Sequence, residues 1–202
     1  MMFNKWKLAP AALLLPGLAL AQLAIQEKGY NIWLIEKPYV GQPALVARMA
    51  GVASYKSYQS NATLAFSCNS GSSSVVSAEL ATDPKPLGFD SDPYEGPDAT
   101  TGGPISIISG NQPAVTHMVS GFFGSGGPFD TDTPFIFSFA PAKAEMQQWV
   151  AQATPGQSLH ITVPAGTGNT KLSFEFRWPE DDAPFKRVVM PCINRMADKS
   201  KH

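Results

Sequence analysis

The chain has few charged residues, few cysteines and few histidines for its length. Charged residues make up 15% of its 202 residues, and it contains two cysteines and three histidines. Its 15 basic residues do not exceed its 16 acidic ones, which argues against nucleic acid or an anionic membrane surface as a partner. The histidines, His117, His160 and His202, do not have the spacing of zinc ligands.

A long apolar run lies near the start of the chain. Lys5 and Lys7 precede an uncharged, Ala- and Leu-rich run from 8 to 20, which closes on Ala-Leu-Ala. This pattern is typical of a secretory signal peptide, here residues 1–21 with cleavage after Ala21. The run is shorter than the roughly 20 apolar residues that span a bilayer. We therefore expect a periplasmic or secreted protein that is not inserted in a membrane after cleavage.

Both cysteines follow the expected cleavage site. An exported chain meets an oxidising compartment, where two cysteines pair by default, so we expect a disulfide between Cys68 and Cys192. The bond would close a loop of about 124 residues, and the chain-entropy model gives such a loop about 4–5 kcal/mol of stabilisation.

The composition favours short strands joined by turns. The chain has 17 glycines and 18 prolines, and several segments alternate apolar and polar residues, as Asn61 to Cys68 does. The predicted fold is mainly β, an antiparallel β-sandwich or open barrel with one or two C-terminal helices. Strands are expected at 29–36, 61–68, 74–81, 104–109, 114–123, 134–140, 157–163 and 170–178.

Two helices are expected in the last third of the chain. One spans 142–153 and carries an apolar stripe that includes Met146 and Trp149. The other runs from about 180 to Met190 and is ended by Pro191. The sequence divides into an N-terminal segment (22–60) whose arrangement the pattern does not predict, a β-rich domain (61–196) and a flexible tail (197–202).

Two long loops, 83–103 and 124–133, carry aromatic and acidic residues. Aromatic residues on loops of a rigid scaffold often anchor protein interfaces, so we expect the partner to be another protein. Phe122 and Phe123 are instead expected to cover the core. The residues predicted to contact the partner are Phe89, Asp90, Asp92, Tyr94, Phe129 and Asp130.

The acidic residues of these loops also allow a cation site. Asp90, Asp92 and Glu95 before Gly96, with a further pair in the second loop, offer the oxygen ligands that calcium favours. The same residue types are common in ordinary turns, because aspartate side chains bond to their own backbone. We expect no other cofactor, and calcium stays open as an alternative.

The sequence gives little support for catalysis. The serine between glycines at 124–127 lacks the Gly-x-Ser-x-Gly spacing of a hydrolase nucleophile. His117 and His160 lie in expected strands and are expected to face solvent. Glu175 and Glu180 are a carboxylate pair whose separation the sequence does not give. We expect no enzymatic activity, with a small secreted hydrolase as an alternative.

The order of expected elements resembles a known family. A strand ends in Cys68, and the last third, from Phe129, includes a strand from Leu172 through Ser173, Phe174 and Glu175 to Phe176. Phe185, Val188 and Cys192 then lie on a short helix. This order resembles the exported accessory proteins of type VI secretion known as VasI/TagO-like. The resemblance implies a non-enzymatic periplasmic accessory role and no catalytic residues. An immunity protein that blocks a periplasm-targeted toxin fits the same expectations.

Overall fold

The computed structural model describes residues 31–37, 45–69, 75–96, 103–125, 127, 133–152, 155–166 and 168–198. The strands in this part of the chain are β1 (Leu34–Glu36), β2 (Val46–Tyr55), β3 (Tyr58–Asn69), β4 (Val75–Thr82), β5 (Ile105–Ser109), β6 (Val115–His117), β7 (Ser120–Phe123), β8 (Phe135–Phe139), β9 (Ser158–Pro164) and β10 (Lys171–Arg177). The helices are α2 (Pro84–Leu87), the 3₁₀ helix η1 (Asp92–Tyr94), α3 (Lys143–Gln152) and α4 (Ala183–Asp198).

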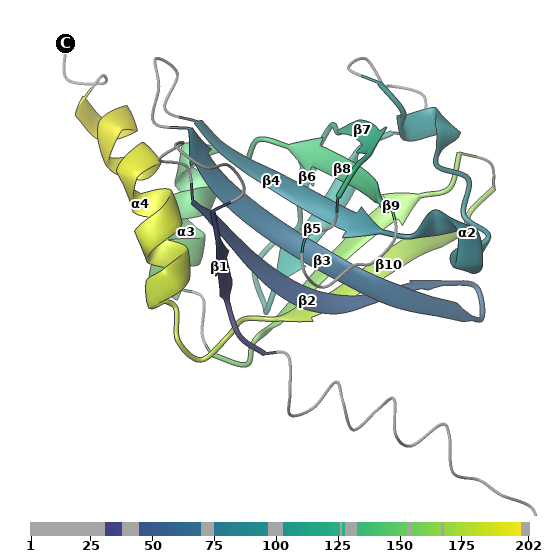
Figure 1. The fold of residues 1–202 in the computed structure, drawn as a ribbon, viewed down its shortest axis with the longest axis horizontal. Coiled ribbons are helices and arrows are strands. Elements are labelled where there is room, and N and C mark those ends of the chain that lie inside the picture. Colours follow the sequence, from purple (N-terminus) through teal and green to yellow (C-terminus); the bar gives the residue numbers. More distant parts are fainter. Residues whose placement is uncertain are drawn as a thin grey trace, which may run out of the picture.

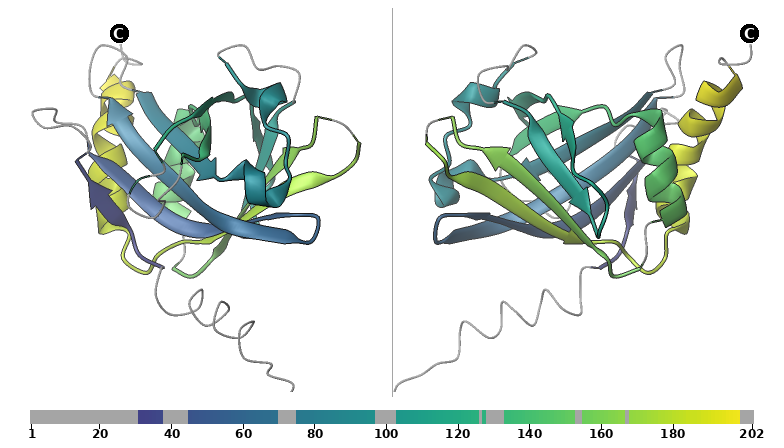
Figure 2. Two further views of the ribbon diagram at one scale, coloured as in Figure 1. Left: turned by 45° about the vertical axis from the view of Figure 1, so that its right-hand side comes forward. Right: turned by 180° about the vertical axis from the view of Figure 1, so that it is seen from behind.

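All of these strands belong to one antiparallel sheet. Its order is β6-β5-β9-β10-β2-β3-β4-β8-β7, and β1 pairs with β2 beside this path. The sheet curls into an open half-barrel, with α3 and α4 together at one end and α2 at the other (Figures 1 and 2). Of the two expected architectures, the open barrel is therefore the one that forms.

The curl brings the two ends of the strand order together. β6 and β7 occupy opposite ends of the order, yet only Met118 and Val119 separate them in sequence. Three extended residues reach about 10 Å, so the two edge strands must lie close in space. The single strand expected over 114–123 is thus wrong, because its two halves pair with β5 and β8 respectively.

Both expected hairpins are confirmed. β3 pairs with β4, with Cys68 opposite Val76, and β9 pairs with β10 over seven residue pairs. The described strands of the segment expected to precede the β-rich domain belong to the same sheet, because β2 pairs with β3 over ten residue pairs and with β10 on its other side. The boundary expected between 60 and 61 therefore falls inside β3.

Aromatic side chains fill the concave side of the sheet at the end near α3 and α4. The Trp33 ring stacks on Phe185 with centroids 5.0 Å apart, and Phe66 meets Phe185 edge to face at 5.1 Å. Trp149 from α3 and Trp178 complete this group at 6.0 Å from each other. Each such pair adds about 0.5–1.5 kcal/mol beyond its area burial, so the group fastens both helices to the sheet.

A second aromatic group lies towards the end near α2. Phe135 and Phe137 of β8 have centroids 4.9 Å apart, and both rings are buried, as the expected phenylalanine-rich strand requires. Phe137 also contacts Phe174 of β10 edge to face at 6.3 Å. Because strand side chains alternate between faces, this row lies on the inner face of the curled sheet.

The two C-terminal helices are confirmed, but the second is longer than expected. α4 continues through Pro191 to Asp198. Proline removes one backbone hydrogen bond and normally breaks a helix. Here Cys192 and Ile193 beyond it are both buried, and that anchoring holds the last turns against the sheet. None of the helices in the described part of the chain is long and apolar enough to cross a membrane.

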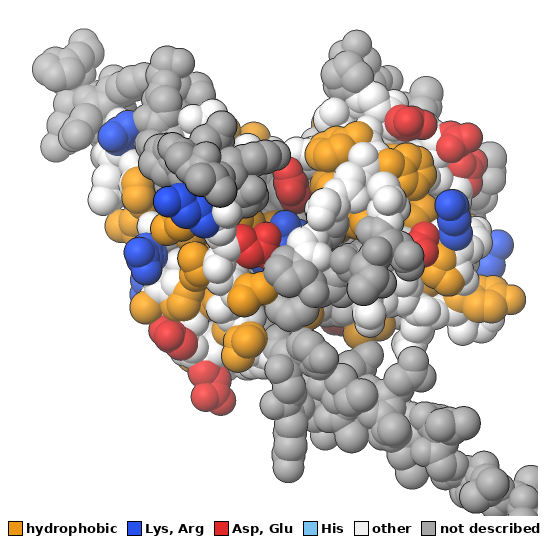
Figure 3. All heavy atoms as spheres, viewed as in Figure 1, with side chains coloured by type: hydrophobic (Ala, Val, Ile, Leu, Met, Phe, Trp, Pro, Cys, Tyr) orange, Lys and Arg blue, Asp and Glu red, His pale blue; other side chains and the backbone are white. Residues whose placement is uncertain are grey.

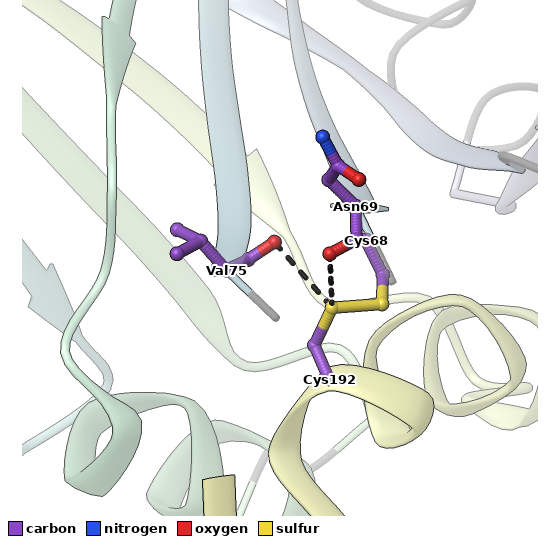
Figure 4. The surroundings of a disulfide bond; sticks show 4 residues. All are labelled: Cys68, Asn69, Val75 and Cys192. Atoms are coloured by element: carbon purple, nitrogen blue, oxygen red, sulfur yellow. Dashed lines mark hydrogen bonds between the residues drawn. A yellow bond between two sulfur atoms is a disulfide. The ribbon is translucent and has the colours of Figure 1, made fainter. Parts of the chain in front are cut away.

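The disulfide joins α4 to the end of β3 (Figure 4). Cys68 and Cys192 are bonded, with Cα atoms 5.8 Å apart and 124 positions apart in sequence. The Cys192 sulfur also lies 3.6 Å from the carbonyl oxygen of Asn69 and 3.4 Å from that of Val75. A bonded sulfur has no proton, so these are packing contacts with the end of β3 and the start of β4. The expected pairing is confirmed, whereas residues 1–21 and the tail beyond 198 lie outside the described residues.

Replacing both cysteines by alanine should destabilise the fold strongly. The variant with Cys68→Ala and Cys192→Ala is expected to lose about 4–5 kcal/mol of unfolding free energy, because its unfolded chain is no longer closed into a long loop. Urea unfolding of the oxidised wild type and of the variant measures this, with reduced wild type as the control. An unchanged urea midpoint would contradict the prediction.

Candidate functional site

The loop between β4 and β5 folds back over the open end of the barrel. Asp83 caps α2 by accepting a hydrogen bond from the Lys85 N–H at 3.0 Å, and Gly88 ends the helix with a φ of +64°. Asp before Pro at the start and Gly at the end are ordinary cap signals. These signals are present in the sequence at 83–88. Residues 83–103 were expected to form one long loop, so this short helix was not predicted.

This fold-back buries two residues that were expected to contact a partner. Phe89 and Tyr94 are 6% and 0% exposed. Phe89 meets Tyr55 edge to face at 5.2 Å, and Tyr94 meets Phe137 at 5.3 Å. The expectation that these rings are exposed on a loop is therefore wrong, because α2 and η1 turn both of them into the core.

The Tyr94 hydroxyl ties this loop to the β9–β10 hairpin. It donates a hydrogen bond to the Pro164 carbonyl oxygen at 2.5 Å. Burial raises the pKa of Tyr94 to about 12, because the phenolate would lose its hydration. The close packing of Pro93 against Gly166, where an added Cβ would lie 2.6 Å from the proline ring, reinforces the same contact. These contacts hold the part of the loop around Pro93 and Tyr94 against the barrel end.

The two acidic residues of this loop remain on the surface. Asp90 and Asp92 are exposed, and Asp90 Oδ1 accepts a hydrogen bond from the Asp92 N–H at 3.1 Å. This is the turn geometry that aspartate commonly adopts. Within the described ranges, no group of three or more metal-ligating side chains is found. The other two predicted partner contacts, Phe129 and Asp130, lie outside the described residues.

The large exposed apolar side chains in this part of the fold lie instead on and beside β7. Met118, Phe122 and Phe123 are 50%, 42% and 45% exposed, and we call these three residues the β7 patch. Phe122 and Phe123 were expected to cover the core, and that expectation is wrong. Consecutive strand residues face opposite sides of a sheet, so a Phe-Phe pair necessarily places one ring outside. Phe123 faces the inner side beside Phe135 at 5.1 Å, but at the rim of the barrel.

The packing of η1 against β7 places acidic residues next to the β7 patch. The Gly96 N–H donates to the Gly121 carbonyl at 2.8 Å, and the Ser120 hydroxyl donates to the Gly96 carbonyl at 3.1 Å. Gly121 allows this approach, since an added Cβ would lie 2.3 Å from the Tyr94 carbonyl oxygen. The exposed Asp92 and Glu95 therefore flank the patch. Figure 3 shows hydrophobic and acidic side chains side by side in the region of β7 and η1.

The first histidine lies at the other edge of the sheet. The His117 Nε2 lies 2.8 Å from Glu145 Oε2 of α3, and the His117 ring packs on Phe139 at 5.0 Å. The same carboxylate oxygen accepts the Ala142 N–H at 3.3 Å, which is the capping role of an acidic residue in the first turn. Glu145 Oε1 is buried and has no hydrogen-bond partner among the described residues. The pair thus fastens α3 to β6.

The second histidine forms a pair on the outer surface. His160 of β9 contacts Glu175, which lies directly opposite it on β10. Both side chains are partly exposed, and a cross-strand pair of this kind contributes roughly 0.2–1 kcal/mol. Glu175, one of the two carboxylates considered for a hydrolase, is therefore engaged by a histidine of the neighbouring strand. The contacts seen for the two imidazole rings among the described residues are with Glu145, Phe139 and Glu175.

A buried ion pair holds β1 on the sheet. Arg48 Nε donates to Glu36 Oε1 at 2.7 Å, and its Nη1 donates to the Thr63 hydroxyl at 3.2 Å. Both charged side chains are largely buried, so each depends on the other to offset lost hydration. This contact connects three strands on the outer face and is structural.

Replacing Tyr94 by phenylalanine should change how stability depends on pH. At pH 7 the free energy of unfolding of the variant is expected to be about 1 kcal/mol lower than that of the wild type, because the Pro164 carbonyl loses its hydrogen-bond donor. Above pH 10 the tyrosine ionises in the unfolded chain, whereas in the folded protein it stays protonated up to about pH 12. The free energy of unfolding of the wild type therefore falls as pH rises, by about 1.4 kcal/mol at pH 11. The difference in free energy of unfolding between the wild type and Tyr94→Phe should therefore disappear by pH 11.

Urea unfolding at both pH values measures this effect. Tyr58→Phe, which alters an exposed ring, is the matched control. A difference in free energy of unfolding between Tyr94→Phe and wild type that stays constant from pH 7 to pH 11 would contradict the prediction.

Comparison with known proteins found no relative from which a function could be inferred. No family model, no curated protein and no solved structure matches it. A functional assignment therefore depends on the geometry of the chain itself.

Proposed function

We propose that this chain is an exported, non-enzymatic protein that binds another protein through the β7 patch. The observation that carries the proposal is the exposure of Met118, Phe122 and Phe123 within six consecutive residues of one sheet edge. Large apolar side chains that remain in water beside each other mark interaction sites, and aromatic residues dominate the energetics of such sites.

The rigidity of the patch supports this proposal. β7 is fixed on one side by its pairing with β8 and on the other by Gly96. A preorganised surface loses little conformational entropy on binding, so more of the contact energy appears as affinity. Asp92 and Glu95 add negative charge at the rim, which selects a partner with basic residues and speeds its approach.

The export part of the proposal rests on the signal-peptide pattern together with the disulfide. Disulfides persist in oxidising compartments, and the Cys68–Cys192 bond is formed. The VasI/TagO-like resemblance makes an accessory role in type VI secretion the first candidate. The exposed Asp90 and Asp92 favour a second, an immunity protein whose acidic surface meets a basic toxin cleft.

A photo-crosslinking residue at position 122 should trap the partner. The expected result is one discrete protein adduct from position 122 and none from position 108, where Ile108 is an exposed apolar residue on β5 and serves as the matched control. Denaturing gels and mass spectrometry of the adduct identify the partner, whose identity separates the accessory role from the immunity role. Equal adducts from both positions, or none from position 122, would count against the proposal.

Charge reversal should weaken the same complex. Asp92→Lys is expected to lower the yield of the position 122 adduct several-fold at low ionic strength, because exposed charge pairs are screened by salt. Lys85→Glu, in the neighbouring α2, is the control for a charge change elsewhere in the loop. If neither Asp92→Lys nor added salt changes the adduct yield, the acidic rim has no part in binding.

Cleavage of the signal peptide is tested directly by mass. The protein recovered from the periplasm or medium should begin at Gln22, and replacing Lys5 and Lys7 by glutamate should leave uncleaved protein inside the cell, because export requires the positive segment. Recovery of the full 202-residue chain from the cytoplasm alone would refute export.

A further inference from the structure

The β7 edge presents main-chain groups as well as aromatic rings. The Gly124 N–H donates to the Pro134 carbonyl at 3.0 Å, so these two residues form a hydrogen-bonded pair between β7 and β8. Such pairs alternate along antiparallel strands. The N–H and C=O of Phe123 therefore point away from β8. Gly121, two residues earlier, has the same orientation, and its carbonyl accepts the Gly96 N–H.

The segment at Gly96 pairs with this edge at Gly121. The Gly96 carbonyl also accepts the Ser120 hydroxyl, and Glu95 and Gly96 both form isolated bridges to Gly121. Among the described residues, no hydrogen bond involves the outward N–H or C=O of Phe123. Within this part of the chain, Phe123 therefore presents main-chain groups to which a further strand could pair.

The opposite end of the strand order has a helix beside it, whereas at β7 the neighbouring segment pairs at Gly121. α3 lies against β6 through the contact of His117 with Glu145, and Gln148 of α3 donates to Gln112 Oε1 at 2.7 Å. Native sheets usually cover an edge with a helix or guard it with lysine or proline. β7 reads Ser-Gly-Phe-Phe and has neither lysine nor proline, so its composition does not guard it against pairing with a further strand.

We propose that the partner contributes an extended segment that adds as a strand to the β7 edge at Phe123 and carries lysine or arginine among its apolar residues. Main-chain hydrogen bonds to Phe123 supply part of the affinity, as in other cases of strand addition. Asp92 and Glu95 select the basic residues by charge complementarity. This inference rests on the proposed function and specifies the partner of the same site.

Three capped hexapeptides serve as probes of the mature, oxidised protein. The first alternates lysine and valine, the second alternates glutamate and valine, and the third repeats the first with every internal amide N-methylated. Binding is followed by NMR through the backbone amide signals of residues 118–124. The lysine–valine peptide should shift the Phe123 amide saturably and bind at least tenfold more tightly than either of the others at low salt.

Two substitutions at one position separate the main chain from the ring. Phe123→Ala removes the ring and keeps the outward N–H, whereas Phe123→Pro removes both, and an outward-facing position on an edge strand tolerates proline. Phe123→Pro should bind the lysine–valine peptide at least fivefold more weakly than Phe123→Ala. Circular dichroism and thermal unfolding of both variants establish that each is folded.

Equal binding by the two folded variants, or equal binding of the glutamate–valine or N-methylated peptide, overturns strand addition. A protein adduct at position 122 that forms equally well in Phe123→Pro and Phe123→Ala also overturns it and leaves protein binding intact. Absence of any protein adduct at position 122 instead removes the proposed function on which this inference rests.

Discussion

The curl of the sheet is the constraint on which the rest of the molecule depends. β6 and β7 are joined by two residues but sit at opposite ends of the strand order, so the sheet cannot lie flat. A curled sheet has a narrow interior that only bulky side chains fill well. The aromatic residues of β3, β8 and β10 meet that requirement, together with those of η1, α3 and α4 and with Phe89, which follows α2.

The same curl explains why aromatic residues also appear outside. Where β7 reaches the rim, the interior ends, and Phe123 contacts Phe135 edge to face but stays 45% exposed. Phe122 faces outwards beside it. The rim is also where η1 meets β7, so apolar and acidic side chains gather in one place without any loop having to move. A binding surface of this kind follows directly from the barrel geometry.

Local patterns predicted the parts of the fold that depend on neighbouring residues. Strand periodicity is a property of a few consecutive positions. It therefore predicted the strand at 61–68, the phenylalanine-rich strand at 134–140 and the C-terminal hairpin. The disulfide followed from the presence of two cysteines in a chain expected to reach an oxidising compartment. The helix beyond Pro191 was not predictable, because burial of Cys192 and Ile193 by distant strands is what sustains it.

The candidate site was harder to predict for the same reason. Phe89 and Tyr94 are buried because a four-residue helix turns the chain over the barrel end, and their partners Tyr55, Phe137 and Pro164 come from three other strands. Which ring of the Phe122–Phe123 pair lies inside depends on where the barrel ends, which no local pattern encodes. The acidic residues Asp90 and Asp92 were correctly placed on the surface, since their turn geometry is local.

The position of the β9–β10 hairpin has a consequence for how the chain reaches its native state. This hairpin, made of residues 158–177, lies between β5 and β2 in the middle of the sheet. Until those residues are present, the first half of the chain and β5 have no common neighbour, so the barrel cannot assemble progressively from its N-terminus. Such long-range pairing is slow to form. For the proposed export of an unfolded chain, late closure would keep the polypeptide unfolded until almost all of it has been made.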